Sequence, residues 1–204
     1  MIENLISFFI ASILLALSPG PDNIYVIAQS LANGTKSGIA TTIGLVSGCI
    51  IHTTLLALGI SAIIATSESI FYALKVVGAL YLFYLAYTVY KSNAQLNITD
   101  KAPKKSYFQL FKQGLIMNLI NPKVLIFFLA FFPGFLWDET QNTIFQFYIL
   151  GVLFMVAAFI VFSSLAILAG SVSSILKENK SVGLLLKWMQ IVVFIGIAVF
   201  ILIP

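Results

Sequence analysis

Long apolar runs separated by short polar gaps make up most of the chain. Six of them approach or exceed the roughly 20 residues that a helix needs to cross about 30 Å of hydrocarbon. These runs are Leu5–Ala32, Ile39–Ala65, Ile70–Tyr90, Phe108–Phe132, Ile144–Ala169 and Leu184–Ile203. Because a backbone in lipid must satisfy its own hydrogen bonds, each run is predicted to be helical. The pattern therefore predicts an all-α membrane protein with six transmembrane helices.

Composition agrees with this class and excludes several others. Of 204 residues, 60% are hydrophobic and only 9% are charged, whereas a soluble domain has about 25% charged residues. The single cysteine, Cys49, excludes an internal disulfide. No lysine precedes the first apolar run, so we expect no cleaved signal peptide.

The lysines indicate how the chain is oriented. They supply the whole positive charge, and because they fall mostly between apolar runs they indicate topology rather than nucleic-acid binding. One side of the membrane receives Lys36, Lys91, Lys101, Lys104, Lys105, Lys112, Lys177, Lys180 and Lys187. The gaps on the other side contain Glu3, Glu68, Asp138 and Glu139. The positive-inside rule then predicts a cytoplasmic lysine side and both termini outside.

A polar stretch over residues 91–107 divides the chain into two parts. It is predicted to be a cytoplasmic linker between a first half, 1–90, and a second half, 108–204, of one transmembrane domain. With three spans in each half, the second half enters the membrane in the opposite orientation. The sequence therefore predicts two inverted three-helix repeats.

Prolines interrupt the first helix of each half. Pro19-Gly20-Pro21 breaks the first run, and Pro122 breaks the fourth at the corresponding position. Each proline removes a backbone donor and clashes with the preceding turn. Paired interrupted helices in two inverted halves are a pointer to a transporter's binding site. A lone proline in a membrane helix more commonly produces only a kink.

The residues around the two breaks are candidates for substrate binding. Pro21 and Pro122 suit the first position of a new half-helix, whose free N–H groups favour an anion such as a carboxylate. Asp22 and Lys123 follow directly, and ionisable side chains at this depth are costly unless paired or hydrated. The candidate set is Pro19, Gly20, Pro21, Asp22, Asn23, Asn121, Pro122 and Lys123. Two interpretations stay open: a transport site, or a fixed structural ion pair between the halves.

A few other side chains carry weaker signals. Gly44, Gly48 and His52 form a small-residue stripe suited to close helix packing. His52, like Asp22, is a candidate for proton coupling, although such a histidine more commonly makes a packing contact. The phenylalanines that follow Pro122 are expected to face lipid, namely Phe127, Phe128, Phe131 and Phe132.

Three segments resemble the LysE/RhtB family of amino-acid exporters. They are SPGPDNIYVIAQSLANGTKSGIATTIGLVSGCIIH at Ser18–His52, KVVGALYLFYLAY at Lys75–Tyr87 and LINPKVLIFFLAFFPGF at Leu119–Phe135. They occur in the family's order and spacing over nearly the whole chain. The resemblance implies a transporter in the cytoplasmic (inner) membrane of a prokaryote that exports an amino acid or derivative by proton antiport. The implied cargo is of the homoserine, threonine, leucine or lysine type.

Other functional classes find less support in the residues. One cysteine and one histidine cannot form a usual soft-metal site, and no enzyme motif is present, so no metal, cofactor or catalytic activity is expected. The alternatives are a metal-ion or other small-solute exporter of the same superfamily, or a non-transporting membrane subunit. The expected partners are a small-molecule amino acid, the proton gradient and membrane lipids. The oligomeric state stays open, a homo-oligomer included.

Overall fold

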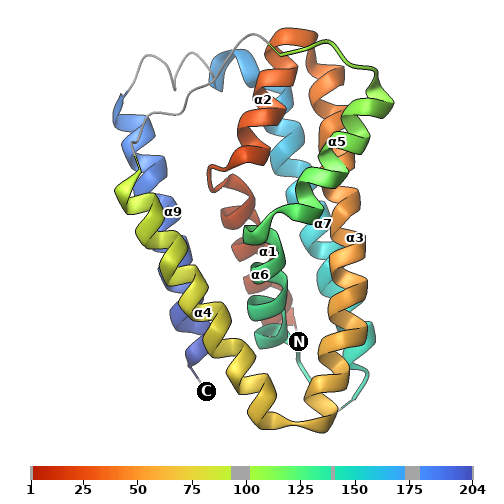
Figure 1. Ribbon diagram of the computed structural model, residues 1–204, viewed down its shortest axis with the longest axis vertical. Coiled ribbons are helices and arrows are strands. Elements are labelled where there is room, and N and C mark those ends of the chain that lie inside the picture. The colour runs from red at the N-terminus through yellow and green to blue at the C-terminus, as the bar shows by residue number, and fades with distance from the viewer. Residues whose placement is uncertain (1, 93–101, 139–140, 173–179, 204) are drawn as a thin grey trace.

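The computed structural model describes residues 2–92, 102–138, 141–172 and 180–203. Those residues form helices and connecting turns without any strand, and the helices lie roughly along one long axis (Figure 1). The elements are α1 (Ile2–Leu17), α2 (Pro21–Asn33), α3 (Thr35–Thr66), α4 (Glu68–Lys91), α5 (Tyr107–Ile120), α6 (Pro122–Phe131), η1 (Phe132–Phe135), α7 (Thr143–Ile167) and α9 (Lys180–Leu202).

The long helices match the apolar runs of the sequence. Four spans are long and apolar enough to cross a membrane, namely Thr35–Ile63, Ser69–Lys91, Thr143–Ile167 and Ser181–Leu202. Two further candidates are bent helix pairs: α1 and α2 meet at 62°, and α5 meets the α6–η1 segment at 54°. The chain is therefore an all-helical membrane protein with four candidate spans, or six if each bent pair is one span.

The two broken helix pairs run in opposite directions along the long axis. Figure 1 shows α1 and α2 rising from the end that bears the N-terminus, whereas α5 and α6 descend toward it. The long helices pack in pairs drawn from both halves, α3 against α7 and α4 against α9. The broken pairs lie between these two packed pairs, so both breaks face the centre of the molecule (Figure 1).

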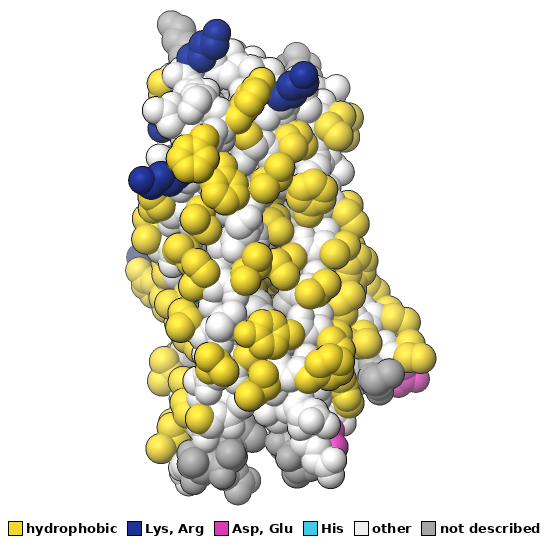
Figure 2. All heavy atoms as spheres, turned by 90° about the vertical axis from the view of Figure 1, so that its right-hand side faces the viewer, with side chains coloured by type: hydrophobic (Ala, Val, Ile, Leu, Met, Phe, Trp, Pro, Cys, Tyr) yellow, Lys and Arg dark blue, Asp and Glu magenta, His cyan; other side chains and the backbone are white. Residues whose placement is uncertain are grey.

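Charged side chains gather at the ends of the molecule. Figure 2 shows an apolar lateral surface, with lysines near one end and acidic side chains toward the other. The lysine end contains the α2–α3 junction with Lys36, the end of α4 with Lys91, and the start of α5. Most of the predicted linker (93–101, including Lys101) lies outside the described residues, as do Glu139 and Lys177.

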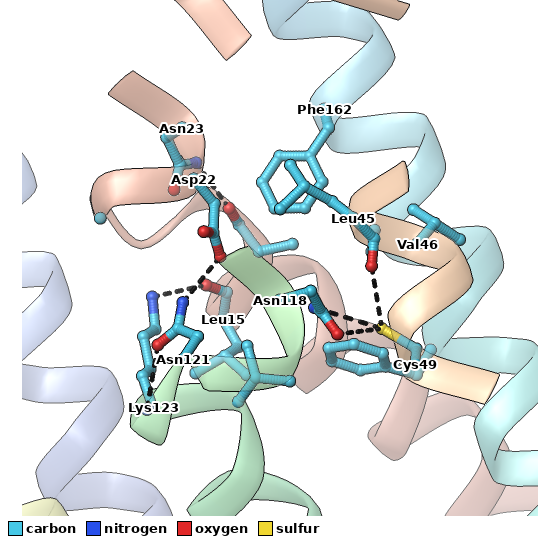
Figure 3. A pocket seen from close by; sticks show the side chains of 15 residues that line it. Leu15, Asp22, Asn23, Leu45, Val46, Cys49, Asn118, Asn121, Lys123 and Phe162 are labelled. Carbon is cyan, nitrogen blue, oxygen red and sulfur yellow. Dashed lines mark hydrogen bonds between the residues drawn. The ribbon is translucent and has the colours of Figure 1, made fainter. Parts of the chain in front are cut away.

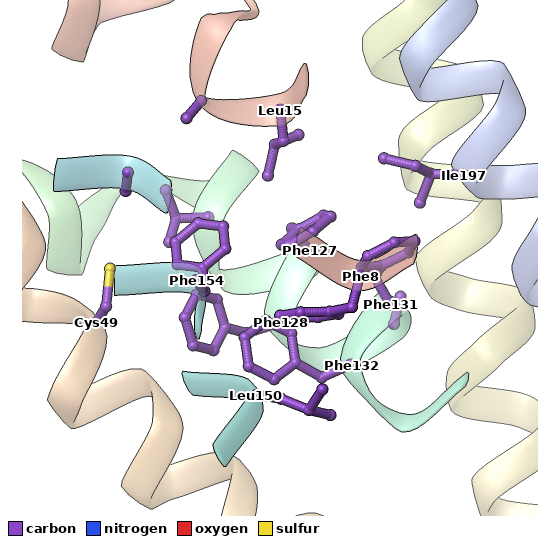
Figure 4. Close-up of a cluster of buried hydrophobic side chains, with 14 of the residues drawn as sticks. Phe8, Leu15, Cys49, Phe127, Phe128, Phe131, Phe132, Leu150, Phe154 and Ile197 are labelled. Carbon is purple, nitrogen blue, oxygen red and sulfur yellow. The ribbon is translucent and has the colours of Figure 1, made fainter. Parts of the chain in front are cut away.

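The phenylalanines of α6 and η1 form the main aromatic core. The expectation that they face lipid is wrong: Phe127, Phe128, Phe131 and Phe132 are at most 2% exposed. Figure 4 shows them clustered with Phe8 of α1, which stacks on Phe131 and meets Phe132 edge-on, and the Phe128 and Phe132 ring centroids lie 4.1 Å apart. The reason is that α6 packs against α3, α4 and α9, and these phenylalanines lie on the sides that contact the protein, while Leu125 on the remaining side is 38% exposed.

Glycines allow α3 and α5 to approach closely. A Cβ atom on Gly44 would collide with the carbonyl oxygen of Phe111, and one on Gly48 would collide with the side chain of Asn118. Gly114 of α5 lies in the same way against the backbone of α3. The predicted packing role of the small-residue stripe is therefore confirmed for Gly44 and Gly48.

We expect Gly44→Ala to destabilise the protein by about 1–3 kcal/mol, because the colliding group is backbone and cannot rotate away. The matched control is Gly59→Ala in the same helix, since a Cβ atom at Gly59 meets nothing within 4 Å. Alanine favours helix over glycine, so the control should melt at the wild-type temperature or slightly above it. Thermal unfolding in detergent measures both variants, and equal melting temperatures would contradict the close packing of α3 on α5.

Candidate functional site

The break between α1 and α2 leaves the last carbonyls of α1 without partners inside that helix. The backbone of Ser18 closes the last turn by donating to the Leu14 and Leu15 carbonyls. Asn23 Nδ2 donates to the Ala16 carbonyl at 2.8 Å. Lys123 Nζ, from the other half of the chain, donates to the Ser18 carbonyl at 3.0 Å and the Leu15 carbonyl at 3.4 Å. The negative end of α1 is therefore capped by a cation, as the helix dipole favours.

Asn121 forms the break between α5 and α6 and joins it to the other break. Its Oδ1 accepts from the backbone N–H of Lys123 at 3.0 Å, which caps the N-terminus of α6. Its Nδ2 donates to Asp22 Oδ2 at 2.8 Å, across the interface between the halves. One amide side chain thus positions the start of α6 and holds the carboxylate of α2.

Asp22 and Lys123 lie at one site but do not form a direct ion pair within the described part of the chain. Asp22 is 7% exposed and is held by Asn121, whereas Lys123 is bound to the α1 carbonyls. Lys123 Nζ also lies 5.6 Å from the centre of the Phe194 ring. A fixed structural ion pair was one of the two interpretations that the sequence left open; among the described residues the α1 carbonyls bind Lys123 instead.

These residues surround a narrow, partly enclosed cavity of about 30 Å³ (Figure 3). Five predicted site residues line it: Gly20, Asp22, Asn23, Asn121 and Lys123. The opposite wall comes from α3 and α7 and includes Leu45, Cys49, Phe154, Ala158 and Phe162. The cavity combines two opposite charges and several amides with a largely apolar wall.

The remaining predicted site residues lie outside this cavity. Pro19 and Pro21 line a second, more open cavity of about 600 Å³, which also contacts Tyr25, Ser92 and Gln190. Gly20 lines both cavities, so only the α1–α2 connection separates them at that point. Pro122 begins α6 and is a lining residue of neither.

His52 is near the cavity but does not line it. It is 4% exposed, its Nε2 lies 3.3 Å from the Asn118 carbonyl oxygen, and its ring lies 5.4 Å from that of Phe128. Its Nδ1 has no hydrogen-bond partner among the described residues. The contacts of His52 are those of a packing histidine one helical turn beyond Cys49.

Asn118 and Cys49 were not predicted as site residues. Asn118 is 3% exposed, and its Nδ2 lies 3.7 Å from Cys49 Sγ, a weak partner for a buried amide. Its side chain occupies the space that Gly48 leaves free. The available signal was an asparagine inside an apolar run, three residues before Asn121. No group of three or more metal-ligating side chains is found in the described residues.

Comparison with known proteins gives a consistent result. The chain is 32% identical over 181 residues to a homoserine/homoserine lactone efflux protein of Salmonella typhimurium, covering 89% of this chain and 87% of that protein. A homoserine/homoserine lactone efflux protein of Salmonella typhi has the same identity and coverage. An uncharacterized membrane protein of Vibrio cholerae is 31% identical over 147 residues, or 72% of this chain and 71% of that protein.

No solved structure matches the chain significantly. The model of the LysE type translocator family matches residues 13–204, which include both helix breaks and the whole cavity lining. The chain therefore belongs to the LysE type translocator family.

Proposed function

We propose that this translocator exports a small amino acid or amino-acid derivative of the homoserine type across the cytoplasmic membrane. The observation that carries the proposal is that Asp22, Asn121 and Lys123 line one narrow cavity, although they come from two different helix breaks. Family membership and the efflux function in the names of two relatives support it.

The negative groups of the site suit an α-ammonium group. Asp22 Oδ1 is buried and has no hydrogen-bond partner among the described residues, so it can accept from a bound cation. The Leu15 and Ser18 carbonyls, which now accept from Lys123, point to the same place. A charged acceptor with two carbonyls matches the three donors of an ammonium group.

The positive groups suit an α-carboxylate. Lys123 supplies a charged donor, and α2 begins at Pro21 after Gly20, which provides no side-chain cap. The first N–H groups of α2 therefore remain free for an anion at the positive end of the helix dipole. At α6 the corresponding position is already occupied by Asn121. The site thus offers one partner set for each end of a zwitterion.

The cavity is narrow around these groups in the structure. A volume of about 30 Å³ admits one or two waters and is too small for an amino acid. The Asn121–Asp22 and Lys123–carbonyl bonds occupy the groups that a zwitterion would use. Substrate entry must therefore replace these bonds, and the cavity of about 600 Å³ beside Gly20 is the route that we propose for loading.

The proposed cycle places this site at the midplane of two inverted repeats. The lysine-rich end faces the cytoplasm, following the positive-inside rule, and both termini lie outside. Export is coupled to proton entry in antiport, with Asp22 binding in turn the substrate ammonium group and a proton. The repeats alternate access to the site by rocking against each other.

An export assay with four amino acids tests this proposal. Cells that lack their own exporters are loaded with labelled homoserine, threonine, leucine or lysine, and efflux is followed with and without the chain. We expect homoserine and threonine to leave faster than lysine, because Asp22 is the single acid among the lining residues and cannot also pair with the second ammonium group of lysine. Failure of the chain to accelerate efflux of any of the four would overturn the proposal.

A further inference from the structure

Gln190 is a polar side chain in the middle of an apolar membrane span. It lies near the centre of the candidate span Ser181–Leu202, and the residues of α9 that follow Lys187 are otherwise aliphatic, aromatic, methionine or glycine. An amide at this depth is costly unless a partner satisfies it. The side chain of Gln190 has no hydrogen-bond partner among the described residues. Packing within the described fold therefore does not explain why a glutamine occupies this position.

The Gln190 side chain lines the larger cavity of about 600 Å³, between α2, α4, α5 and α9. It is half-buried, and its amide is not among the fully buried polar atoms of the chain. The other two polar side chains of this lining are not free in the same way. The Tyr25 hydroxyl is fully buried, and the Ser92 hydroxyl donates to the Val89 carbonyl at 2.8 Å. Among the described lining residues, Gln190 is therefore the one whose polar side-chain group is both open to the cavity and unpaired.

Gln190 lies one helical turn from the residue of α9 that contacts Lys123. The centre of the Phe194 ring is 5.6 Å from Lys123 Nζ. Residues four apart share a helix face and are separated by about 6 Å along the axis. On its other side Lys123 borders Gly20, because a Cβ atom built on Gly20 would lie 3.8 Å from Lys123 Nζ. Since Gly20 lines both cavities, Lys123 lies at the wall between them, about one turn from Gln190.

The larger cavity has the size and lining of a small-molecule site. Its volume lies within the usual range of roughly 300–1,000 Å³, and its walls are mainly apolar with a few polar groups. A substrate whose carboxylate and ammonium groups bind Lys123 and Asp22 can extend its side chain past Gly20 into this cavity. The side chain then points toward α9 and reaches Gln190. An amide both donates and accepts, so it suits a hydroxyl group, which does the same.

We infer that Gln190 binds the side-chain hydroxyl of the substrate and thereby selects short hydroxy amino acids over aliphatic ones of the same length. The inference rests on the proposed function, because it uses Asp22 and Lys123 as the partners of the zwitterion. An aliphatic side chain in the same place covers the Gln190 amide without satisfying it. A site built to bind a hydroxyl disfavours the analogue that lacks it for this reason.

Homoserine and norvaline form the matched substrate pair for the test, because norvaline carries a methyl group where homoserine has its hydroxyl. The full chain is reconstituted in proteoliposomes, and counterflow of each labelled amino acid is measured below saturation. We expect the wild-type chain to prefer homoserine by about tenfold, the factor that one buried hydrogen bond provides. Gln190→Leu keeps the approximate size and removes the amide, so the ratio of the two rates should fall to within about twofold of one. The ratio is taken within one variant, so the amount of folded protein cancels.

Gln190→Glu tests the same contact by a gain of transport. It adds an acid where we place the end of the substrate side chain, which supplies the partner that the second ammonium group of lysine lacks at Asp22. We expect lysine counterflow to rise relative to homoserine by roughly tenfold, as a charged hydrogen bond provides. A packing role for Gln190 gives no reason for such a gain.

Two control variants separate this contact from general effects on α9 and on the cavity. Met189→Leu changes the neighbouring residue of α9, which lines neither cavity, by a volume-conserving swap and should leave both rates unchanged. Ser92→Ala removes a lining hydroxyl that is already bonded within its own segment, so the ratio of homoserine to norvaline should stay at the wild-type value.

The outcomes are distinct. Equal wild-type rates for homoserine and norvaline would overturn the inference while leaving the proposed export intact. A Gln190→Leu variant that slows both amino acids and keeps their ratio would overturn it in favour of a packing role. Unchanged lysine transport by Gln190→Glu would also overturn it, because the substrate side chain would then lie elsewhere. Absence of transport of homoserine, threonine, leucine and lysine by the wild-type chain would instead remove the proposed function.

Discussion

Replacing Lys123 by methionine is expected to abolish homoserine export while leaving the protein in the membrane. Lys123 is the cation that we assign to the substrate carboxylate, and its Nζ also caps α1 through the Ser18 carbonyl at 3.0 Å. Without Lys123 the substrate carboxylate would have no charged partner, and losing one partner of such a buried pair costs roughly 3–5 kcal/mol, which corresponds to a rate loss of roughly a hundredfold or more. Efflux from preloaded cells, normalised to the amount of protein in the membrane, measures the effect.

Lys75→Met is the matched control for this variant. Lys75 lies within α4, with its Nζ 4.7 Å from the centre of the Phe71 ring, and it does not line the cavity. The Lys75→Met variant also removes one positive charge from a membrane-spanning helix, so a general effect of lysine removal would appear in both variants. Export at the wild-type rate by Lys123→Met would show that the carboxylate is bound elsewhere.

The helical layout follows closely from the sequence, because an apolar run long enough to cross the membrane must satisfy its own backbone hydrogen bonds and therefore forms a helix. Each apolar run coincides with a long helix or a bent pair, and the helices end at Leu17 and Ile120, beside the prolines that cannot continue them. Lipid exposure was harder to predict. The phenylalanines after Pro122 are equally apolar whether they face lipid or protein, and only the packing of α6 against its neighbours decides that they are buried.

The candidate site was predictable in its residues but not in its bonds. Asp22, Asn121 and Lys123 stand out in sequence because polar groups are costly at that depth. The partners of Lys123 are backbone carbonyls that the α1 break exposes, and no side chain in the sequence indicates them. Asn118 and the opposite wall on α3 and α7 come from helix packing between distant segments, so no local pattern identified them.

Asp22→Asn is expected to abolish pH-driven export because it removes charge with little change in shape. The asparagine oxygen can still accept from Asn121 Nδ2, which now lies 2.8 Å from Asp22 Oδ2, so the contact between the halves is retained. The asparagine side chain cannot take up a proton, and it cannot form an ion pair with the substrate ammonium group. Efflux measured across a range of external pH should be flat and near background, and Glu3→Gln, an acid in the first turn of α1, should behave as wild type.

The double change Asp22→Asn with Lys123→Met tests whether the two charges act together. Each single change leaves one uncompensated charge at a narrow cavity, whereas the double change leaves none. We therefore expect the double variant to melt at a higher temperature than either single variant, with an interaction free energy of about 0.5–3 kcal/mol in the thermodynamic cycle. Export should remain absent, because both ionic partners of the zwitterion are gone. Strictly additive losses of stability would show that the charges are independent, since each would then be satisfied by Asn121 or the α1 carbonyls alone.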